Sequence, residues 1–561
     1  MICKIFSLFI VFFFALKLNA QTDSISKYSP PLNIPLILSA NFGELRPNHF
    51  HMGLDFKTNG TEGIKLLAIA DGYVSRIKIS PYGYGKAVYI NHPNGITSLY
   101  AHCSSLLGKL DSIVKLTQIK EQNFEIEIFL DENDITIKRG ENFALSGNSG
   151  SSTAPHLHFE LRDTKTETAL NPLKFGFNII DTKAPEIKNV KIYRLTEKGY
   201  RIKGKSKIIP VQKGKYGYFI GGDVLYAPSD FCSNEGGIGF AFEVIDHYNQ
   251  SENPLGLYGS YLIVDKDTIF GQKIDSVSFE SSRQINTHSD YEEFVINKRK
   301  FQKSFKTNIN SLPIYHNDEL GIVNLKQNDT LNISYIAFDT KNNRSELSFK
   351  LISLPGIIGE PYHIQTNDYL LPDSNFIIKN NEVSFSIPKN CVYEPIPKKM
   401  KFIKGFSIGD PYAPIQKAIA IKLPLIEYKL PIEKYYISIN SKYIPTVFSN
   451  GWLCAESKSL GEFTIKTDTI GPVITTLNFL KTDSILKKQI LQWKIIENKS
   501  SLKDYDLYID GNWVLLEFES KGSFAYYTKP KDLLGKHLLK IIAKDGCGNN
   551  SIWEKEIRFQ E

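Results

Sequence analysis

Hydrophobic and polar residues alternate with a period of two in many short stretches of this chain, and this pattern predicts strands. A clear case is the segment 124–130 (FEIEIFL), which is typical of a strand with one solvent-facing side. Two further β-rich runs, 68–79 and 87–91, are joined by the glycine-containing turn 80–85. Tyr, Phe, Ile and Thr are frequent throughout and suit pleated, half-buried surfaces. We therefore expect a mainly β protein.

The pattern changes after residue 173, where alternating runs follow two similar junction motifs. Asp181-Thr182-Lys183-Ala184-Pro185 precedes the run 186–193, and Asp468-Thr469-Ile470-Gly471-Pro472 precedes the run 473–480. Both motifs combine a turn-forming Asp with a Pro, and this combination is typical of a hinge between domains.

Three later segments place Asp, Asn and Ser in the same order between apolar strands: Asp246…Asn249…Ser251, Asp339…Asn343…Ser345 and Asp545…Asn549…Ser551. Because Asx side chains bond to their own backbone in tight turns, these segments indicate terminal hairpins of immunoglobulin-like sandwiches. Three independent polar hairpins are the alternative. We expect an N-terminal β-sheet domain over residues 21–184, then about three β-rich units: an Ig-like sandwich over 185–356, a β-rich domain over 357–470 and a C-terminal Ig-like sandwich over 471–561.

The first twenty residues have the pattern of a secretory signal peptide. Lys4 precedes an apolar run, 5–16, and small and polar residues follow up to Ala20. The run is shorter than the roughly 20 residues that a membrane span requires, and no second run of this kind follows. We therefore expect residues 1–20 to be removed and no transmembrane segment to remain after cleavage. A retained N-terminal anchor is the alternative.

Composition adds little to this picture. The 561 residues contain 67 Lys and Arg against 60 Asp and Glu, a net charge of +7, which becomes +5 without Lys4 and Lys17. This bias is too small to indicate nucleic-acid binding. The five cysteines beyond residue 20 form no C-x-x-C pair, so we expect mostly free, buried thiols, with a Cys391–Cys454 disulfide left open.

Histidines gather in the N-terminal third, where six of the eleven lie before residue 173. His51 and Asp55 are four residues apart, and His156 and His158 are two apart, so each pair shares one face of a strand. Three histidines and one carboxylate form a ligand set that suits Zn²⁺. Each pair alone is more often a polar strand face with hydrogen-bonded histidines, but the combination indicates a metal site.

These residues lie in segments that resemble the M23 (lysostaphin/LytM-type) zinc metallopeptidases, in particular exported members from Bacteroidota. The resemblance covers residues 41–173, and its motifs occur in the order of the family: Phe42-Gly43-Glu44-Leu45-Arg46-Pro47-Asn48-His49-Phe50-His51-Met52-Gly53-Leu54-Asp55, Ala70-Asp71-Gly72-Tyr73-Val74, Leu99-Tyr100-Ala101-His102, and Gly147 through Leu161 with Ala154-Pro155-His156-Leu157-His158. It implies that residues 21–184 form an M23-type β-sheet peptidase domain.

The resemblance also implies roles for five residues. His51, Asp55 and His158 match the three ligands of a single zinc ion. His102 and His156 match the catalytic pair that handles the attacking water and the developing oxyanion. This division agrees with a catalytic zinc that has three protein ligands, and with the absence of an H-E-x-x-H glutamate base. His49 alternates with His51, but its distance from Asp55 makes it a rim residue.

One departure from compact family members is the long interval between His102 and Ser146. We expect its excess length, 119–137, to form an added hairpin near the cleft, which would alter the shape of the substrate groove.

The resemblance implies an exported zinc metalloendopeptidase, in the periplasm or at the cell surface, that cleaves the peptide cross-links of peptidoglycan. In a directly cross-linked wall the bond would join D-Ala to meso-diaminopimelate. The C-terminal domains could bind other envelope components, and we expect them to be dispensable for catalysis on small peptides. The alternatives are a non-catalytic wall-binding regulator of another hydrolase, and a surface adhesin that carries an M23-like domain.

Overall fold

The computed structural model describes residues 28–560 except 233–234, 317–318, 355–358, 360–365, 403–404, 428, 480–484 and 488, and the expected signal peptide lies outside the described residues. Strands dominate this part of the chain, which confirms the mainly β fold. None of the helices described here has both the length and the apolar character that crossing a membrane requires. All five described cysteines are free.

The N-terminal domain contains two main antiparallel sheets and the short antiparallel pair β2–β3. The larger has the order β1-β4-β13-β8-β7-β6-β10, with β11 beside β6 and β14 beside β13, and the smaller has the order β5-β12-β9. The elements are β1 (Leu38–Ala40), β2 (Leu45–Arg46), β3 (His49–Phe50), β4 (Leu54–Lys57), β5 (Lys65–Leu67), β6 (Gly72–Ile79), β7 (Lys86–Asn91), β8 (Ile96–Ala101), β9 (Ser105–Leu106), α1 (Lys109–Glu121), β10 (Ile126–Phe129), β11 (Thr136–Ile137), β12 (Asn142–Leu145), β13 (His156–Asp163) and β14 (Ala169–Leu170).

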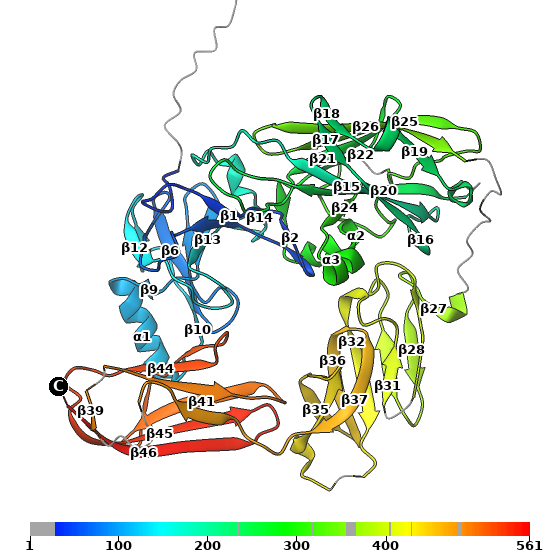
Figure 1. The fold of residues 1–561 in the computed structure, drawn as a ribbon. Helices are drawn as coiled ribbons and strands as arrows, with labels where there is room; N and C mark the ends of the chain where they lie inside the picture. The colour runs from blue at the N-terminus through cyan, green and yellow to red at the C-terminus, as the bar shows by residue number, and fades with distance from the viewer. Residues whose placement is uncertain are drawn as a thin grey trace, which may run out of the picture.

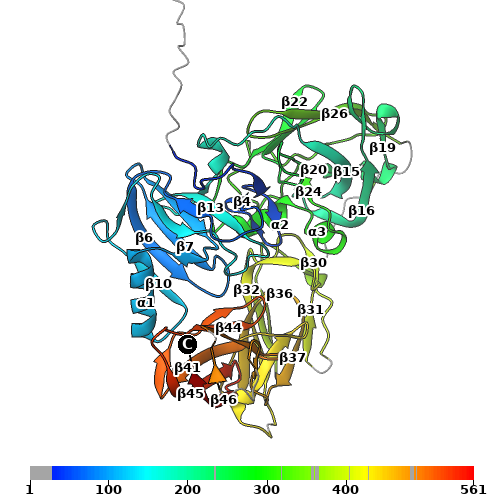
Figure 2. The ribbon, with the colours of Figure 1, turned by 60° about the vertical axis from the view of Figure 1, so that its left-hand side comes forward.

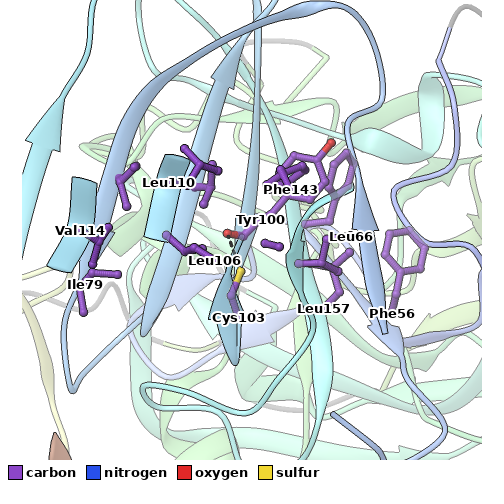
Figure 3. Packing of buried hydrophobic residues seen from close by; sticks show 14 of the residues in the cluster. Phe56, Leu66, Ile79, Tyr100, Cys103, Leu106, Leu110, Val114, Phe143 and Leu157 are labelled. Carbon is purple, nitrogen blue, oxygen red and sulfur yellow. Dashed lines mark hydrogen bonds between the residues drawn. The ribbon is translucent and has the colours of Figure 1, made fainter. Parts of the chain in front are cut away.

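The core of this domain lies on the face of the large sheet opposite to its histidines. Figure 3 shows Phe56, Tyr100 and Leu157 in one buried cluster with Leu66 and Phe143. Phe56, Tyr100 and Leu157 are fully buried, and each is within two residues of a predicted site residue. Because successive side chains of a strand point to opposite faces, packing on this side holds the polar side in place.

The long interval after His102 does not form the added hairpin that we expected over 119–137. It contains the helix α1, which ends at Glu121, and the strands β10 and β11, which both pair with β6 and not with each other. Leu110, Val114 and Gln118 are the buried residues of α1. Their spacing of four residues places them on one helix face, a periodicity that the sequence shows and that our prediction missed.

Three further units follow, and each has two main sheets. The second unit combines a sheet of order β16-β15-β20-β24 with one of order β17-β18-β26-β25-β21-β22, and Phe242 stacks on Tyr335 between them with ring centroids 3.6 Å apart. Its elements are β15 (Glu186–Leu195), β16 (Arg201–Pro210), β17 (Gln212–Gly214), β18 (Gly217–Phe219), β19 (Val224–Ala227), β20 (Gly237–Ile245), β21 (Gly259–Val264), β22 (Asp267–Lys273), β23 (Ser276–Val277), α2 (Ile285–His288), α3 (Tyr291–Asn297), β24 (Phe301–Lys303), β25 (Thr330–Phe338) and β26 (Arg344–Ser353).

The third unit has the sheets β28-β29-β32-β36-β35 and β31-β37-β33-β34, and the fourth has β38-β40-β44-β43 and β39-β46-β45-β41-β42. The elements of the third are β27 (Tyr369–Leu370), β28 (Phe376–Lys379), β29 (Ser384–Ile387), β30 (Ile396–Pro397), β31 (Phe406–Ile408), β32 (Pro414–Pro424), β33 (Tyr435–Ile439), β34 (Lys442–Tyr443), β35 (Thr446–Ser449), β36 (Trp452–Ser459) and β37 (Gly461–Thr467). Those of the fourth are β38 (Val473–Thr476), β39 (Ile485–Leu486), β40 (Ile490–Ile496), β41 (Leu502–Ile509), β42 (Asn512–Val514), β43 (Glu517–Glu519), β44 (Phe524–Thr528), β45 (Gly535–Asp545) and β46 (Asn550–Phe559).

The four units follow one another around a closed circuit, so that the fourth returns to the first (Figures 1 and 2). The second unit joins the N-terminal domain through the β14–β23 pair and through Asn41, whose side chain bonds both the N–H and the C=O of Gly256 at 2.8 Å. The fourth unit contacts the N-terminal domain through the ion pair between Lys86 and Glu517, 2.7 Å long. The histidine-bearing domain is therefore held from two sides.

Candidate metal centre

Strand β13 places four polar side chains on one face of the large sheet. His156, His158, Glu160 and Arg162 alternate along it, and the three residues between them are apolar and buried. In the register of the sheet, His158 lies opposite Asp55 on β4 and opposite Ala101 on β8, the residue before His102. Antiparallel pairing thus brings together residues that are 50 to 100 positions apart in the sequence.

Three donor atoms from these strands converge. His51 Nε2 lies 3.0 Å from Asp55 Oδ1 and 3.1 Å from His158 Nδ1, and His158 Nδ1 lies 2.8 Å from Asp55 Oδ1. All three residues are largely buried, and they form one of the groups whose donor atoms could hold a metal ion together. The structure thus brings the three predicted ligands to one point.

Hydrogen bonds on the far side of each imidazole determine which nitrogen faces that point. His51 Nδ1 lies 2.8 Å from the carbonyl oxygen of Asn41, and His158 Nε2 lies 2.8 Å from Glu160 Oε1. Because these oxygens only accept, each imidazole can donate an N–H outward and leave its inward nitrogen to bind a cation. Burial would lower the pKa of His158, but hydrogen bonds to Asp55 and Glu160 raise it to about 9, so a metal ion that binds here displaces the inward proton of His158.

The donor set fits zinc. Zn–N and Zn–O bonds of about 2.0–2.2 Å in a tetrahedron separate neighbouring ligand atoms by about 3.3–3.6 Å, and the observed separations are shorter by a few tenths of an ångström. Two imidazoles and one carboxylate are common ligands of catalytic zinc, with the fourth position left for water or substrate. That His51, Asp55 and His158 bind zinc stays a prediction.

Glu160 supports His158 from behind and was not among the predicted site residues. Its side chain is fully buried, accepts a 2.7 Å hydrogen bond from Arg162 Nε at Oε2 and a 2.5 Å bond from the Tyr84 hydroxyl at Oε1. Burial would raise the pKa of Glu160, but Arg162 and His158 together lower it to about 2. A permanently ionised carboxylate behind a ligand histidine fixes the orientation of its ring and increases its basicity.

The two predicted catalytic histidines lie beside this cluster. The ring of His102 lies 4.8 Å from that of His156 and 5.9 Å from that of His158, and His156 Nε2 lies 3.5 Å from Asp55 Oδ1. Burial, assisted by His158 and His156, lowers the pKa of His102 to about 3. His102 is therefore a neutral imidazole at pH 7, with one ring nitrogen unprotonated.

A single loop orients both of the predicted catalytic histidines. His102 Nδ1 donates to the carbonyl oxygen of Ser149 at 2.9 Å, and His156 Nδ1 donates to that of Ala154 at 2.8 Å. The Ser152 hydroxyl lies 3.1 Å from the same nitrogen of His156. In both rings Nε2 is consequently the nitrogen that remains available for proton transfer.

The local geometry around His51 differs from our expectation of a single strand. Strand β4 begins at Leu54, and residues 51–53 link it to β3. A Cβ on Gly53 would lie 2.4 Å from the carbonyl oxygen of Phe159, so glycine allows the link to pass close to β13. His49 is exposed on β3, bonds to Pro47 and lies outside the cluster of donor atoms.

Several residues of the site could not be found by spacing alone. Glu160 continues the alternation of His156 and His158, and this was a usable signal. The other contributions are the backbone carbonyls of Asn41 and Ser149 and the hydroxyl of Tyr84. The pattern of side chains along the sequence does not predict contacts of this kind.

Comparison with known proteins agrees with this geometry. Residues 49–119 match the model of peptidase family M23, and residues 367–468 match that of the Zu5-like domain. The chain is 32% identical over 156 residues to an uncharacterized metalloprotease of Haemophilus influenzae, and 31% identical over 112 residues to the DD-carboxypeptidase/endopeptidase Mpg of Neisseria meningitidis serogroup B. The matches cover 28% and 20% of this chain, and only 26% and 20% of those relatives.

Among solved structures, the catalytic domain of the prophage-encoded M23 protein EnpA from Enterococcus faecalis is 25% identical and aligns with 26% of this chain and 97% of its own, with a TM-score of 0.20. The catalytic domain of lysostaphin from Staphylococcus simulans is 24% identical and aligns with 25% of this chain and 91% of its own, with a TM-score of 0.19. The similarity to peptidase family M23 therefore lies in the N-terminal domain, where the family model matches residues 49–119.

Proposed function

We propose that this protein is an exported zinc metalloendopeptidase that cleaves the peptide cross-links of peptidoglycan. The observation that carries the proposal is the convergence of His51 Nε2, Asp55 Oδ1 and His158 Nδ1 within 3.1 Å of one another, beside two further histidines. The relative from Neisseria is described as a carboxypeptidase and endopeptidase, which supports peptide-bond hydrolysis.

The side chains around the metal centre fit the hydrolysis of an amide. Zn²⁺ bound by the three ligands would supply a Lewis acid at the site. Nε2 of His102 or His156 accepts the proton that the attacking water loses. The protonated imidazole then stabilises the oxyanion through a hydrogen bond and transfers this one proton to the leaving amine as the C–N bond breaks, which returns the imidazole to its neutral form.

The lining of a groove beside the candidate metal centre favours a peptide as the substrate. It has a volume of about 650 Å³ and begins at Tyr84, whose ring lies 5.3 Å from that of His158. Its lining combines aromatic rings with charges of both signs: Arg76, Lys78, Tyr82, Tyr89, Glu125, Arg162 and Phe279. Stem peptides of peptidoglycan carry both carboxylates and amines, and such a lining suits an extended segment of this kind. For a directly cross-linked wall the cleaved bond is that between D-Ala and meso-diaminopimelate.

The fourth unit contacts the loop that orients the catalytic histidines. Lys521, in the turn between β43 and β44, donates from Nζ to the carbonyl oxygens of Asn148 and Ser152, the latter at 3.1 Å. The Ser520 hydroxyl donates to the carbonyl oxygen of Pro81. Ser149, within the loop, receives the hydrogen bond from His102. We therefore revise the expectation that the C-terminal region is dispensable for catalysis: Lys521 fixes the loop behind both proton-transfer groups.

Variants at four of the five site positions give distinct predictions for zinc. His158→Ala and Asp55→Ala should lose both zinc and activity, because each removes a ligand. His102→Ala and His156→Ala should retain stoichiometric zinc while turnover falls by at least about 100-fold, the usual size of a general acid–base contribution. Elemental analysis of the purified variants measures zinc per chain, and stoichiometric zinc loss in His102→Ala would contradict the assignment of roles.

The carboxylate behind His158 should tune metal affinity without contacting the metal. Glu160→Gln keeps the shape of the side chain but removes the charge that accepts from His158, and should weaken zinc binding by about 10–100-fold. Glu167→Gln, at an exposed glutamate, is the matched control and should bind zinc as the parent does. Competition with a chromogenic chelator measures both, and equal affinities would show that Glu160 has no supporting role.

Purified peptidoglycan tests the substrate. The zinc-loaded protein should release soluble muropeptides whose masses correspond to cleaved cross-links. Removal of zinc by a chelator should abolish this release, and added zinc should restore it. A zinc-loaded protein that binds sacculi without releasing any product would instead support the non-catalytic regulator.

The contact between Lys521 and the loop predicts a change in the rate at which the protein hydrolyses a small soluble peptide. Lys521→Ala should lower kcat by about tenfold, the equivalent of about 1.4 kcal/mol, with zinc content unchanged, and Lys521→Arg should recover part of the loss. Lys536→Ala is the control, because Lys536 is an exposed lysine of the same unit paired with Glu556. Parent-like kcat in Lys521→Ala would restore the view that the C-terminal region is dispensable.

A further inference from the structure

Three aspartates meet at the junction between the N-terminal domain and the second unit. Asp181 precedes β15, Asp246 follows β20 and Asp339 follows β25. One carboxylate oxygen of each lies within 4.8 Å of the others. The first belongs to a predicted hinge motif and the other two to the Asp–Asn–Ser segments, so two sequence patterns that the peptidase site does not use come together here.

Backbone and side-chain donors hold these aspartates in place. Asp339 Oδ1 accepts from the N–H groups of Lys341 and Asn343, and Asp246 Oδ1 accepts from that of His247. Asn343 Nδ2 donates both to Asp339 Oδ2 and to the carbonyl oxygen of Asp181. The cluster is therefore positioned by its own hairpins and is not a chance meeting of mobile side chains.

The three aspartates of this cluster are buried together without a direct ion pair among the described residues. Their exposed fractions are 7%, 1% and 2% for Asp181, Asp246 and Asp339. In the described part of the chain no Lys, Arg or His lies within ion-pair distance of them, and Lys341 acts on Asp181 only from farther away. Burial and mutual repulsion accordingly raise the pKa of Asp181 to about 7 and that of Asp246 to about 8.

One oxygen of the cluster also has no hydrogen-bond partner. Asp181 Oδ2 is buried and accepts from no donor among the described residues. A buried carboxylate oxygen without a donor costs about 1–3 kcal/mol or more, and a cation would remove this cost. This carboxylate oxygen without a donor, together with the three buried aspartates, indicates that the cluster binds a cation.

We propose that Asp181, Asp246 and Asp339 form a calcium site that fastens the N-terminal domain to the second unit. All donors are oxygens, which favours a hard cation over zinc. Ca–O bonds of up to about 2.6 Å allow two ligand oxygens to lie up to about 5.2 Å apart, which covers the observed separations. The site is independent of the peptidase centre and of the activity proposed for it.

A second acidic group, Asp468, Glu497 and Asp545, occupies the corresponding junction before the fourth unit. Its oxygens are supplied with donors: the Ser500 hydroxyl bonds Asp468 Oδ2, and Asn549 bonds both oxygens of Asp545. Among the described residues, none of these three has a buried carboxylate oxygen without a donor. The calcium site is therefore assigned to the first junction alone.

Calorimetric titration of the full chain with Ca²⁺ tests the proposal, after treatment with EGTA and reloading with one equivalent of zinc. Asp246→Asn and Asp339→Asn should each lose one equivalent of bound calcium, or bind it at least tenfold more weakly. Asp267→Asn, at an exposed aspartate of β22, is the control and should keep the calcium uptake of the parent.

Thermal unfolding separates lost binding from lost folding. Removing one charge from a crowded group relieves repulsion, so the calcium-free melting temperature of Asp246→Asn should be no lower than that of the parent. Only the parent and Asp267→Asn should gain melting temperature when Ca²⁺ is added. Equal calcium uptake by the parent and Asp246→Asn, or binding of Mg²⁺ by the parent as tightly as Ca²⁺, would overturn the assignment.

Discussion

The geometry of the candidate metal centre depends on the alternation of side chains along β13. One face of this strand is apolar and fully packed, and the other carries His156, His158, Glu160 and Arg162. A slip of one residue in its register would exchange the two faces, burying four polar groups and exposing the core. The hydrophobic core therefore does more than stabilise the domain, because it determines which atoms face the candidate metal site.

Ion pairs and hydrogen bonds then orient the polar side chains that the strand places on this face. Arg162 keeps Glu160 ionised, Glu160 orients His158, and His158 directs Nδ1 to the same point as Asp55. Each of these contacts satisfies a buried polar group, so the network depends on all of its members. Among the described residues, the three aspartates at the junction have no ion-pair partner of this kind.

The fold class could be predicted from the period-two alternation in the sequence. Short spacings gave the pairs His51–Asp55 and His156–His158, and the resemblance to the M23 peptidases implied that His51, Asp55 and His158 converge. Helix α1 was missed although its buried positions have helical spacing, since the neighbouring alternation in 124–130 favoured strands. The contacts of Asn41 with Gly256 and of Lys521 with Ser152 join residues more than 200 positions apart. Such pairs depend on how whole units pack, and no local pattern specifies them.

The closed circuit of units has a consequence for the timing of activity. The chain is synthesised from its N-terminus, and Lys521 is made 369 residues after Ser152, the loop residue that it bonds. At roughly 5–20 residues per second, the histidine-bearing domain exists for about 20–70 s before its last support is available. A hydrolase of the proposed kind, with its site loop supported by Lys521, would reach full competence only after its whole chain has been made.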